Sequence, residues 1–167
     1  QPLAETRGFL YCYPDSAIDP ATFEFWNGTD ACCDFWTTGN DDSGYLRALI
    51  AEIGRQFVVD RKRIYLIGHS NGGYLAYHMA CQYADLIAAI AGVSGSTFLD
   101  PNCCRPSQPV NILQIHGTAD QYQFYWGGAN VTTTPPFPAN LPPFPSAPRS
   151  VEMWAGYNAA TGAVTEP

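Results

Sequence analysis

Residues 68–72, with the sequence GHSNG, have the residue types and the spacing of a serine nucleophile. In a G-x-S-x-G elbow the serine lies at a sharp turn between a strand and a helix, and the two glycines remove side chains that would clash in the tightly packed turn. The flanks agree, because the apolar run 64–67 suits a buried parallel strand and Leu75 and Met79 follow at helical spacing. We therefore predict that Ser70 is a nucleophile for acyl transfer. The alternative is an ordinary serine in a turn of small residues.

Ser70 needs a base to take its proton, an acid to orient that base, and donors for the oxyanion that forms during acyl transfer. The backbone N–H of Asn71 is predicted at the N-terminus of the following helix, where it can donate to the oxyanion. Asp120 is the candidate acid, because it follows the apolar run 110–115 in a polar turn. A loop at this end of a parallel strand lies at the carboxyl edge of the sheet, where α/β enzymes build their sites.

The sequence does not identify the catalytic base that would take the proton of Ser70. In α/β-hydrolases the histidine follows the acid along the chain, whereas His69, His78 and His116 all precede Asp120. His69 is the variable residue of the elbow and His78 lies two helical turns after Ser70, so we interpret both as structural. His116 is close to the same sheet edge and stays a candidate base, although its order in the chain is wrong.

The elements that would position these residues alternate between strand and helix. A helix is predicted after Asp41 and Asp42, which suit its N-terminus, and its apolar residues recur at helical spacing: Leu46, Leu49, Ile50, Ile53 and Phe57. The remaining predictions are strands at 9–13 and 110–115, a strand or helix–strand junction at 86–93, a long loop beside the site at 14–40, and a short helix at 150–159. This alternation predicts an α/β fold with a largely parallel sheet.

Residues 121–148 differ from the rest of the chain in being rich in proline and aromatic side chains. Proline is excluded from helix interiors and central strands, so we predict an extended loop. The loop directly follows Asp120, and Tyr125 and Trp126 offer flat surfaces to an aromatic or sugar ring of a substrate. The alternative is an insertion that packs on the surface.

The motifs GHSNGG and HGTAD, at this separation and together with the runs GFLYCYPDS and NDDSGYLRALIAEI, resemble the polyhydroxybutyrate depolymerase-like esterases. That group also takes in feruloyl and acetylxylan esterases, and the resemblance covers nearly the whole chain. It implies an α/β-hydrolase fold, with Ser70 as nucleophile and Asp120 as triad acid. It also implies that the family's base histidine lies in a Gly-Gly-His-type segment beyond Pro167, and its second oxyanion donor in a strand before Gln1.

The resemblance also implies a sheet that is incomplete at both ends. In the resembled fold, the strand that precedes GFLYCYP lies in space between that strand and the strand before Ser70. A buried strand that loses its neighbour leaves backbone groups without hydrogen-bond partners. We therefore expect residues 1–167 to be part of a single catalytic domain, with the missing N- and C-terminal parts of that domain as partners.

Composition excludes several function classes. The 167 residues are 46% hydrophobic, as in a globular domain, and carry a net charge of −7. The only basic cluster is 61–63, so we predict no nucleic-acid partner. The sequence has no run of 18 apolar residues, so we predict no membrane span. No cysteine lies in a C-x-x-C motif, so we predict no metal and no cofactor.

The six cysteines predict a disulfide-bonded, secreted protein. They include two vicinal pairs, and we favour a bond between Cys32 or Cys33 and Cys103 or Cys104. Cys12 and Cys81 are equally well explained as buried free thiols. The glycosylation sequons at Asn27 and Asn130 are compatible with secretion.

Taken as an enzyme, the chain is expected to be a secreted serine carboxylic-ester hydrolase that forms an acyl-enzyme. The expected substrates are feruloyl or acetyl esters of polysaccharide, or an aliphatic polyester. The alternative is a catalytically inactive fragment or a binding module that retains the nucleophile elbow.

Overall fold

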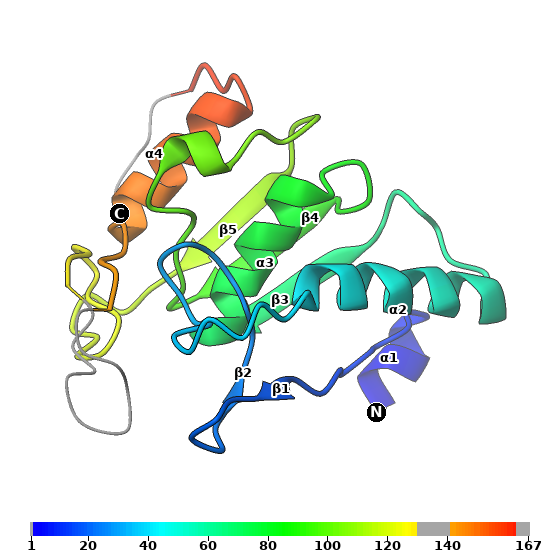
Figure 1. Cartoon of the computed structure of the whole chain (residues 1–167). Coiled ribbons are helices and arrows are strands. Elements are labelled where there is room, and N and C mark those ends of the chain that lie inside the picture. The colour runs from blue at the N-terminus through cyan, green and yellow to red at the C-terminus, as the bar shows by residue number, and fades with distance from the viewer. Residues whose placement is uncertain (1, 130–140, 163–167) are drawn as a thin grey trace.

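Three short parallel strands form the sheet that carries the site. The computed structural model describes residues 2–129 and 141–162. Strands β3 (Tyr65–His69), β4 (Ala89–Val93) and β5 (Asn111–Ile115) lie in the order β3-β4-β5, with Gly68 opposite Gly92 and Gly92 opposite Gln114. Parallel strands need a crossover connection, and α3 supplies it between β3 and β4 (Figure 1). This arrangement confirms the predicted α/β class.

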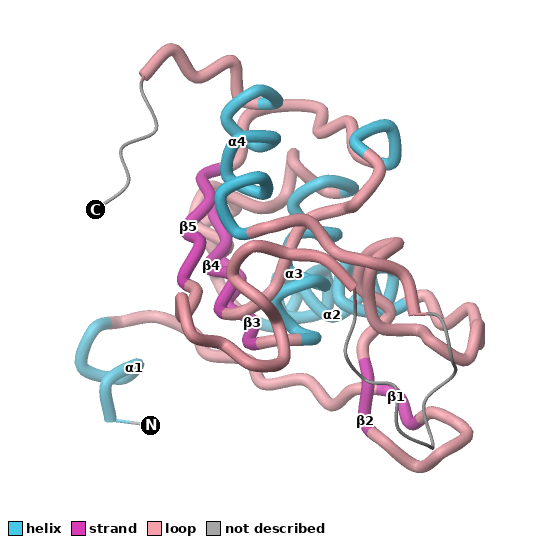
Figure 2. Tube along the Cα trace, turned by 90° about the vertical axis from the view of Figure 1, so that its left-hand side faces the viewer, coloured by secondary structure: helices cyan, strands magenta, loops and turns pink. Residues whose placement is uncertain are grey.

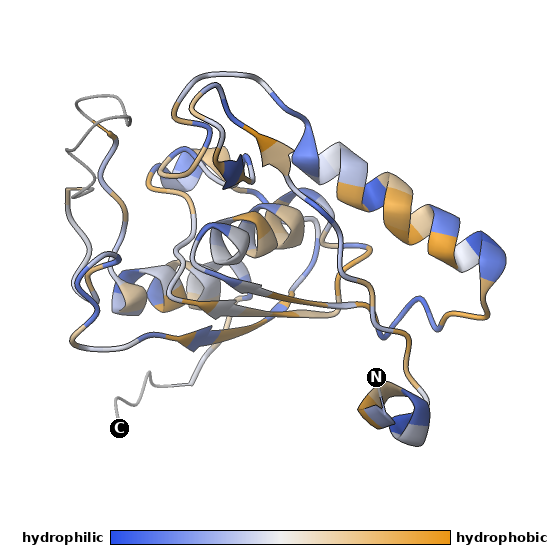
Figure 3. Ribbon diagram, turned by 90° about the horizontal axis from the view of Figure 1, so that it is seen from below, coloured by the Kyte–Doolittle hydropathy of each residue, from blue (hydrophilic) through white to orange (hydrophobic). Residues whose placement is uncertain are grey.

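The helices gather on one side of this sheet (Figure 2). They are α2 (Asp42–Gln56), α3 (Asn71–Gln82) and α4 (Ala147–Tyr157). Asp41 caps α2 by accepting a hydrogen bond from the N–H of Gly44, as the sequence predicts for this position. Along α2, apolar residues alternate with hydrophilic ones (Figure 3), and Leu46 and Ile50 pack against the core. None of the helices in the described residues combines the length and apolar character needed to cross a membrane.

The core lies between α3, α4 and the inner face of the sheet. Its largest buried side chain is Trp154 of α4, whose ring lies 5.9 Å from that of Tyr77 in α3. The indole N–H of Trp154 donates to the hydroxyl of Thr97 at 2.8 Å, so this buried polar group is satisfied. Other members of the core come from α3, from β4 and from the segments just before β4 and β5: Leu75, Met79, Ile87, Ile90 and Val110.

The opposite face of the sheet is apolar and is not covered by any described element. Alternate residues of β3 and β5 project from it: Tyr65 (61% exposed), Ile67 (72%), Leu113 (56%) and Ile115 (46%). Helix α1 (Pro2–Arg7) lies away from this face (Figures 2 and 3). Isolated exposed apolar residues are ordinary, but a row of them across neighbouring strands marks a surface that needs a partner.

The predicted strand at 9–13 is absent. Residues 9–16 have no strand structure, and the side chains of Phe9, Leu10, Tyr11 and Tyr13 are exposed. A strand requires a neighbour to complete its backbone hydrogen bonds, and no described strand pairs with this segment. Farther along, within the predicted loop 14–40, the chain forms a small antiparallel hairpin of β1 (Ala17–Ile18) and β2 (Glu24–Phe25). The sequence analysis did not predict this hairpin.

The predicted disulfide pairing is wrong. Cys81 at the end of α3 pairs with Cys104, with Cα atoms 5.6 Å apart, and Cys32 pairs with its neighbour Cys33. Cys12 and Cys103 are exposed and unpaired in the described part of the chain. The predicted bond between the two vicinal pairs does not form in this structure. The end of α3 places Cys81 beside the short 3-10 helix η1 (Pro101–Cys103), where it bonds to Cys104. Cys81 is therefore not the free thiol that the sequence analysis considered, and Cys12 is not buried.

Candidate active site

Ser70 lies in the turn between β3 and α3, in strained backbone. Its φ of 50° and ψ of −117° are uncommon for a residue with a side chain. The turn is held by three hydrogen bonds: the N–H of Ser70 donates to the carbonyl of Val93 at 2.7 Å, and its own carbonyl accepts from the N–H groups of Gly73 (2.8 Å) and Tyr74 (3.2 Å). The geometry is that of a nucleophile elbow.

Close backbone contacts explain some of the glycines at this turn. A Cβ at Gly68 would clash with the backbone of Gly72 and lie 2.7 Å from the nitrogen of Gly73. A Cβ at Gly95, in the loop after β4, would lie 2.8 Å from the Cα of Gly73. At Gly72 itself there is open space, so the prediction that both motif glycines avoid a clash holds for Gly68 alone.

Asn71 is the first residue of α3 and has two distinct polar groups. Its backbone N–H has no acceptor within the helix, as for every first-turn residue, and it lies at the positive end of the helix dipole. Its side-chain amide binds the backbone of Trp26 on a distant loop. The sequence analysis named the N–H but missed the role of the side chain.

Asp120 lies in the turn after β5, at the same edge of the sheet. One of its oxygens accepts hydrogen bonds from the N–H groups of Tyr122 (2.9 Å) and Gln123 (3.0 Å), and the hydroxyl of Ser94 also donates to the carboxylate. Burial raises the pKa of Asp120, but these hydrogen bonds outweigh burial and bring the pKa below its ordinary value. Asp120 is therefore ionised at neutral pH.

Ser94 directly follows β4, which lies between the strands that precede Ser70 and Asp120. Its φ is 49°, and its N–H donates to the carbonyl of Ile115 at 2.9 Å. The first turn of α3 is tied to the acid's turn as well, because the hydroxyl of Tyr74 donates to the side-chain oxygen of Gln123 at 2.5 Å. The sequence analysis missed Ser94, although its place after the apolar run of β4 is the same as that of Ser70 after β3.

His116 is positioned to support the turn and not to serve Ser70. Its side chain is 1% exposed, and its Nε2 lies 3.9 Å from a carboxylate oxygen of Asp120 and 2.6 Å from the carbonyl of Gln123. Because a carbonyl only accepts, Nε2 carries the proton, and Nδ1 accepts from the amide of Gln114 at 3.1 Å. Both ring nitrogens are occupied, which removes His116 as a candidate base.

The other two histidines do not contact the acid. His69 ends β3 and is exposed, whereas His78 in α3 packs edge-on against Phe98, with ring centroids 5.5 Å apart. The Nδ1 of His78 is buried without a hydrogen-bond partner in the described residues. The described residues therefore bring together the elbow and an ionised carboxylate, and they contain no histidine with a ring nitrogen placed between the two.

Tyr125 and Trp126, the predicted substrate contacts, take different positions. Tyr125 is half-buried, with its ring 5.9 Å from that of His116 and 5.0 Å from that of Trp126. Trp126 is 72% exposed. Tyr125 thus supports the turn around His116, while Trp126 offers an accessible aromatic surface. Part of the loop predicted at 121–148, residues 130–140, lies outside the described residues.

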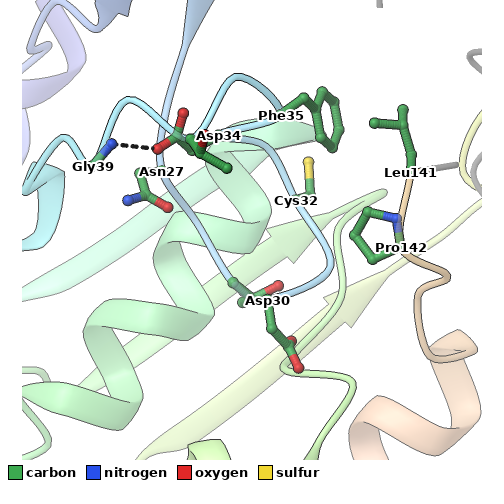
Figure 4. A pocket seen from close by; sticks show the side chains of 10 residues that line it. Asn27, Asp30, Cys32, Asp34, Phe35, Gly39, Leu141 and Pro142 are labelled. Atoms are coloured by element: carbon green, nitrogen blue, oxygen red, sulfur yellow. Dashed lines mark hydrogen bonds between the residues drawn. The ribbon is translucent and has the colours of Figure 1, made fainter. Parts of the chain in front are cut away.

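A cavity of about 550 Å³ opens beside the loop that Asn71 contacts (Figure 4). One wall is the segment 27–39 and the other is Leu141 and Pro142, from the proline-rich loop that follows Asp120. The residues seen most clearly around it are Asn27, Asp30, Cys32, Asp34 and Phe35. A cavity of this size has room for a small organic group. Its lining mixes polar side chains such as Asp30 and Asp34 with the apolar side chains of Phe35 and Leu141.

Comparisons with known proteins agree with this geometry. A family model for phospholipases and carboxylesterases matches residues 40–131. Feruloyl esterase B of Piromyces equi is 34% identical over 159 residues, which are 93% of this chain and 28% of that protein. The bifunctional acetylxylan esterase/xylanase XynS20E of Neocallimastix patriciarum is 30% identical over 123 residues, 74% of this chain and 16% of that protein. The chain thus spans only a minor part of either relative.

A solved structure has the same fold. The crystal structure of native sOPH matches 86% of this chain and 50% of its own with a TM-score of 0.51, at 18% identity. Together with the parallel sheet, this bears out the α/β-hydrolase fold, and the two esterases bear out the resemblance drawn from GHSNGG and HGTAD. The chain belongs to the phospholipase/carboxylesterase family of α/β-hydrolases.

Proposed function

We propose that this chain carries the nucleophile and the acid of a serine carboxylesterase that works through an acyl-enzyme. The observation that carries the proposal is the strained elbow at Ser70, on the same sheet edge as the ionised Asp120. Ser70 gives its proton to the base and attacks the ester carbonyl, and the N–H of Asn71 donates to the oxyanion. Asp120 orients the base, which passes the proton to the alcohol as the ester C–O bond breaks. Water then releases the acyl group from Ser70.

The base is a histidine from a part of the polypeptide outside residues 1–167. This part of the proposal rests on two observations: His69, His78 and His116 are all placed away from this role, and the relatives are much longer than this chain. The carboxylate of Asp120 is already oriented by Tyr122, Gln123 and Ser94 and can accept a further hydrogen bond from an imidazole. The same outside segments would cover the apolar sheet face.

The substrate is an ester of a plant-polysaccharide type, with a feruloyl or an acetyl acyl group. Two relatives carry the names feruloyl esterase and acetylxylan esterase, and the exposed ring of Trp126 can stack on an aromatic or sugar ring. Steady-state rates with methyl ferulate, acetylated xylan and a hydroxybutyrate oligomer separate these substrates from an aliphatic polyester. Turnover of the oligomer alone would contradict the polysaccharide assignment.

Secretion is supported by the disulfide between Cys81 and Cys104. Of the two sequons, the one at Asn27 is not open to glycosylation in the folded chain. The amide nitrogen of Asn27 donates to the carbonyl of Asn40 at 2.9 Å, and Thr29 is buried. Asn130 lies outside the described residues.

The test is labelling of the natural polypeptide with a fluorophosphonate, followed by intact mass and peptide mapping. We expect one adduct, on Ser70, and none in the variant Ser70→Ala. The matched control is Ser107→Ala, which removes an exposed loop serine and should label like the parent protein. A folded polypeptide that is not labelled, or is labelled elsewhere, would support the alternative of an inactive protein that retains the elbow.

A further inference from the structure

The side chain of Asn71 holds both backbone groups of a residue 45 positions earlier in the chain. Its Oδ1 accepts from the N–H of Trp26 at 2.6 Å, and its Nδ2 donates to the carbonyl of Trp26 at 2.8 Å. Only an amide of this length can accept and donate at the same time, since a carboxylate cannot donate and alanine can do neither. Asn71 therefore acts as a two-point clamp on Trp26.

The clamp is reinforced by contacts of the next two residues. The N–H of Asn27 donates to the carboxylate of Asp42 at 2.6 Å, at the start of α2. A Cβ at Gly28 would lie 2.6 Å from the Cβ of Tyr74, so Gly28 lies directly against α3. Residues 26–28 are thus attached to the first turns of both helices.

These attached residues begin the wall of the cavity. The segment 27–39 supplies most of its lining, including Asn27, Cys32, Asp34 and Phe35 (Figure 4). The carboxylate of Asp34 accepts from the N–H groups of Thr38 and Gly39, which closes the far end of the segment. The wall is therefore fixed relative to Ser70 through the residue that directly follows Ser70.

We propose that the side chain of Asn71 is a positioning residue that determines which acyl groups reach Ser70. This inference rests on the esterase function proposed above. In this proposal the cavity beside residues 27–39 takes a bulky aromatic acyl group, and the side chain of Asn71 holds its wall. The backbone N–H of Asn71 serves the oxyanion of every ester. An acetyl group is too small to need that wall. The backbone N–H and the side chain of Asn71 therefore have effects on hydrolysis that can be measured separately.

The test compares methyl ferulate with 4-nitrophenyl acetate in the natural polypeptide. In Asn71→Ala the backbone N–H is kept and two hydrogen bonds to Trp26 are lost. We expect the ratio of kcat/KM for methyl ferulate to that for the acetate to fall at least about tenfold, chiefly through a higher KM for methyl ferulate.

The chain offers a matched control in Asn158. Its amide clamps the backbone of Val110 in the same manner, at 3.1 Å and 2.8 Å, but at the opposite end of β5 from Asp120. Asn158→Ala loses the same kind of hydrogen bonds and should lower stability while leaving the ratio of kcat/KM for the two esters unchanged. An equal change of this ratio in Asn158→Ala would mean that the effect is one of general stability.

The outcomes separate this inference from the proposed function. If the parent protein hydrolyses neither ester, the esterase proposal fails. If the parent hydrolyses both esters and Asn71→Ala lowers both rates in proportion, the inference on Asn71 fails while the esterase proposal stands.

A second variant, Phe35→Ala, changes the same wall and leaves the Asn71 side chain in place. It should also lower the ratio of kcat/KM for methyl ferulate to that for the acetate. An unchanged ratio would contradict the inference even if Asn71→Ala does not fold.

Discussion

At the scale of single residues, the site combines a strained serine with a carboxylate that three donors keep ionised. Ser70 adopts a positive φ that its side chain disfavours, and the surrounding hydrogen bonds maintain it. Asp120 is oriented by Tyr122, Gln123 and Ser94. Both residues follow strands of the same sheet, so the positions of their polar atoms are determined by the backbone and not by flexible side chains alone.

The pKa of Asp120 predicts a defined pH dependence of stability. A carboxyl group whose pKa is lowered by folding stabilises the protein above its unfolded pKa, near the ordinary value of 3.8, and loses that contribution as pH falls through the folded pKa. We expect Asp120→Asn to cost about 1 kcal/mol of unfolding free energy at neutral pH. Urea unfolding of parent and variant from neutral pH to about pH 3 should show this difference shrinking at the acid end. A difference for Asp120→Asn that stays constant across this pH range would contradict the proposed ionisation.

At the scale of elements, α3 connects the site to the core. Its first turn carries the elbow, its buried face carries Tyr77 and Met79, and its last turn carries Cys81. The disulfide from Cys81 to Cys104 ties that last turn to the connection between β4 and β5. The end of α3 away from Ser70 is therefore fixed covalently.

The vicinal pair Cys103 and Cys104 allows a matched test of this link. Cys104→Ser breaks the disulfide, whose cysteines are separated by 23 residues, and should cost about 3 kcal/mol of unfolding free energy. Cys103→Ser changes the exposed, unpaired neighbour and should have little effect. Thermal or urea unfolding measures both, and peptide mapping without reduction should recover Cys81 joined to Cys104. A peptide that joins Cys32 or Cys33 to Cys103 or Cys104 would restore the pairing first predicted from the sequence.

At the scale of the whole molecule, the sheet is covered on one face and apolar on both. Helices α2, α3 and α4 lie on the inner side, while Tyr65, Ile67, Leu113 and Ile115 are exposed on the other. An exposed row of this kind favours association with further protein. The proposal that outside segments complete the domain assigns this face a partner within the same polypeptide.

Substitution on this face tests that assignment. In the natural polypeptide, Ile67→Glu should lower the unfolding free energy by more than about 2 kcal/mol, because a charge would be buried without a partner. Val58→Glu, at an exposed position in the loop before β3, should stay within about 0.5 kcal/mol of the parent. Equal stability of the two variants would show that the face is open to water in the complete protein.

The sequence by itself determined the features that depend on neighbouring residues. The turn at Ser70, the cap at Asp41, helices α2, α3 and α4, and strands β3 and β5 follow from local spacing of glycines, polar caps and apolar residues. The same reasoning placed Asp120 in the turn after β5, because parallel strands end at a common edge. The predicted strand at 9–13 failed for a related reason: an apolar run becomes a strand only when a neighbouring strand pairs with it.

Only the tertiary structure decided the contacts between distant residues. The clamp from Asn71 to Trp26, the link from Cys81 to Cys104 and the donation from Ser94 to Asp120 join segments 23 to 45 positions apart. The burial of His116, which occupies both of its ring nitrogens, is of the same kind. Local propensity carries no information on such pairs, because the distance between them is set by how the helices pack on the sheet.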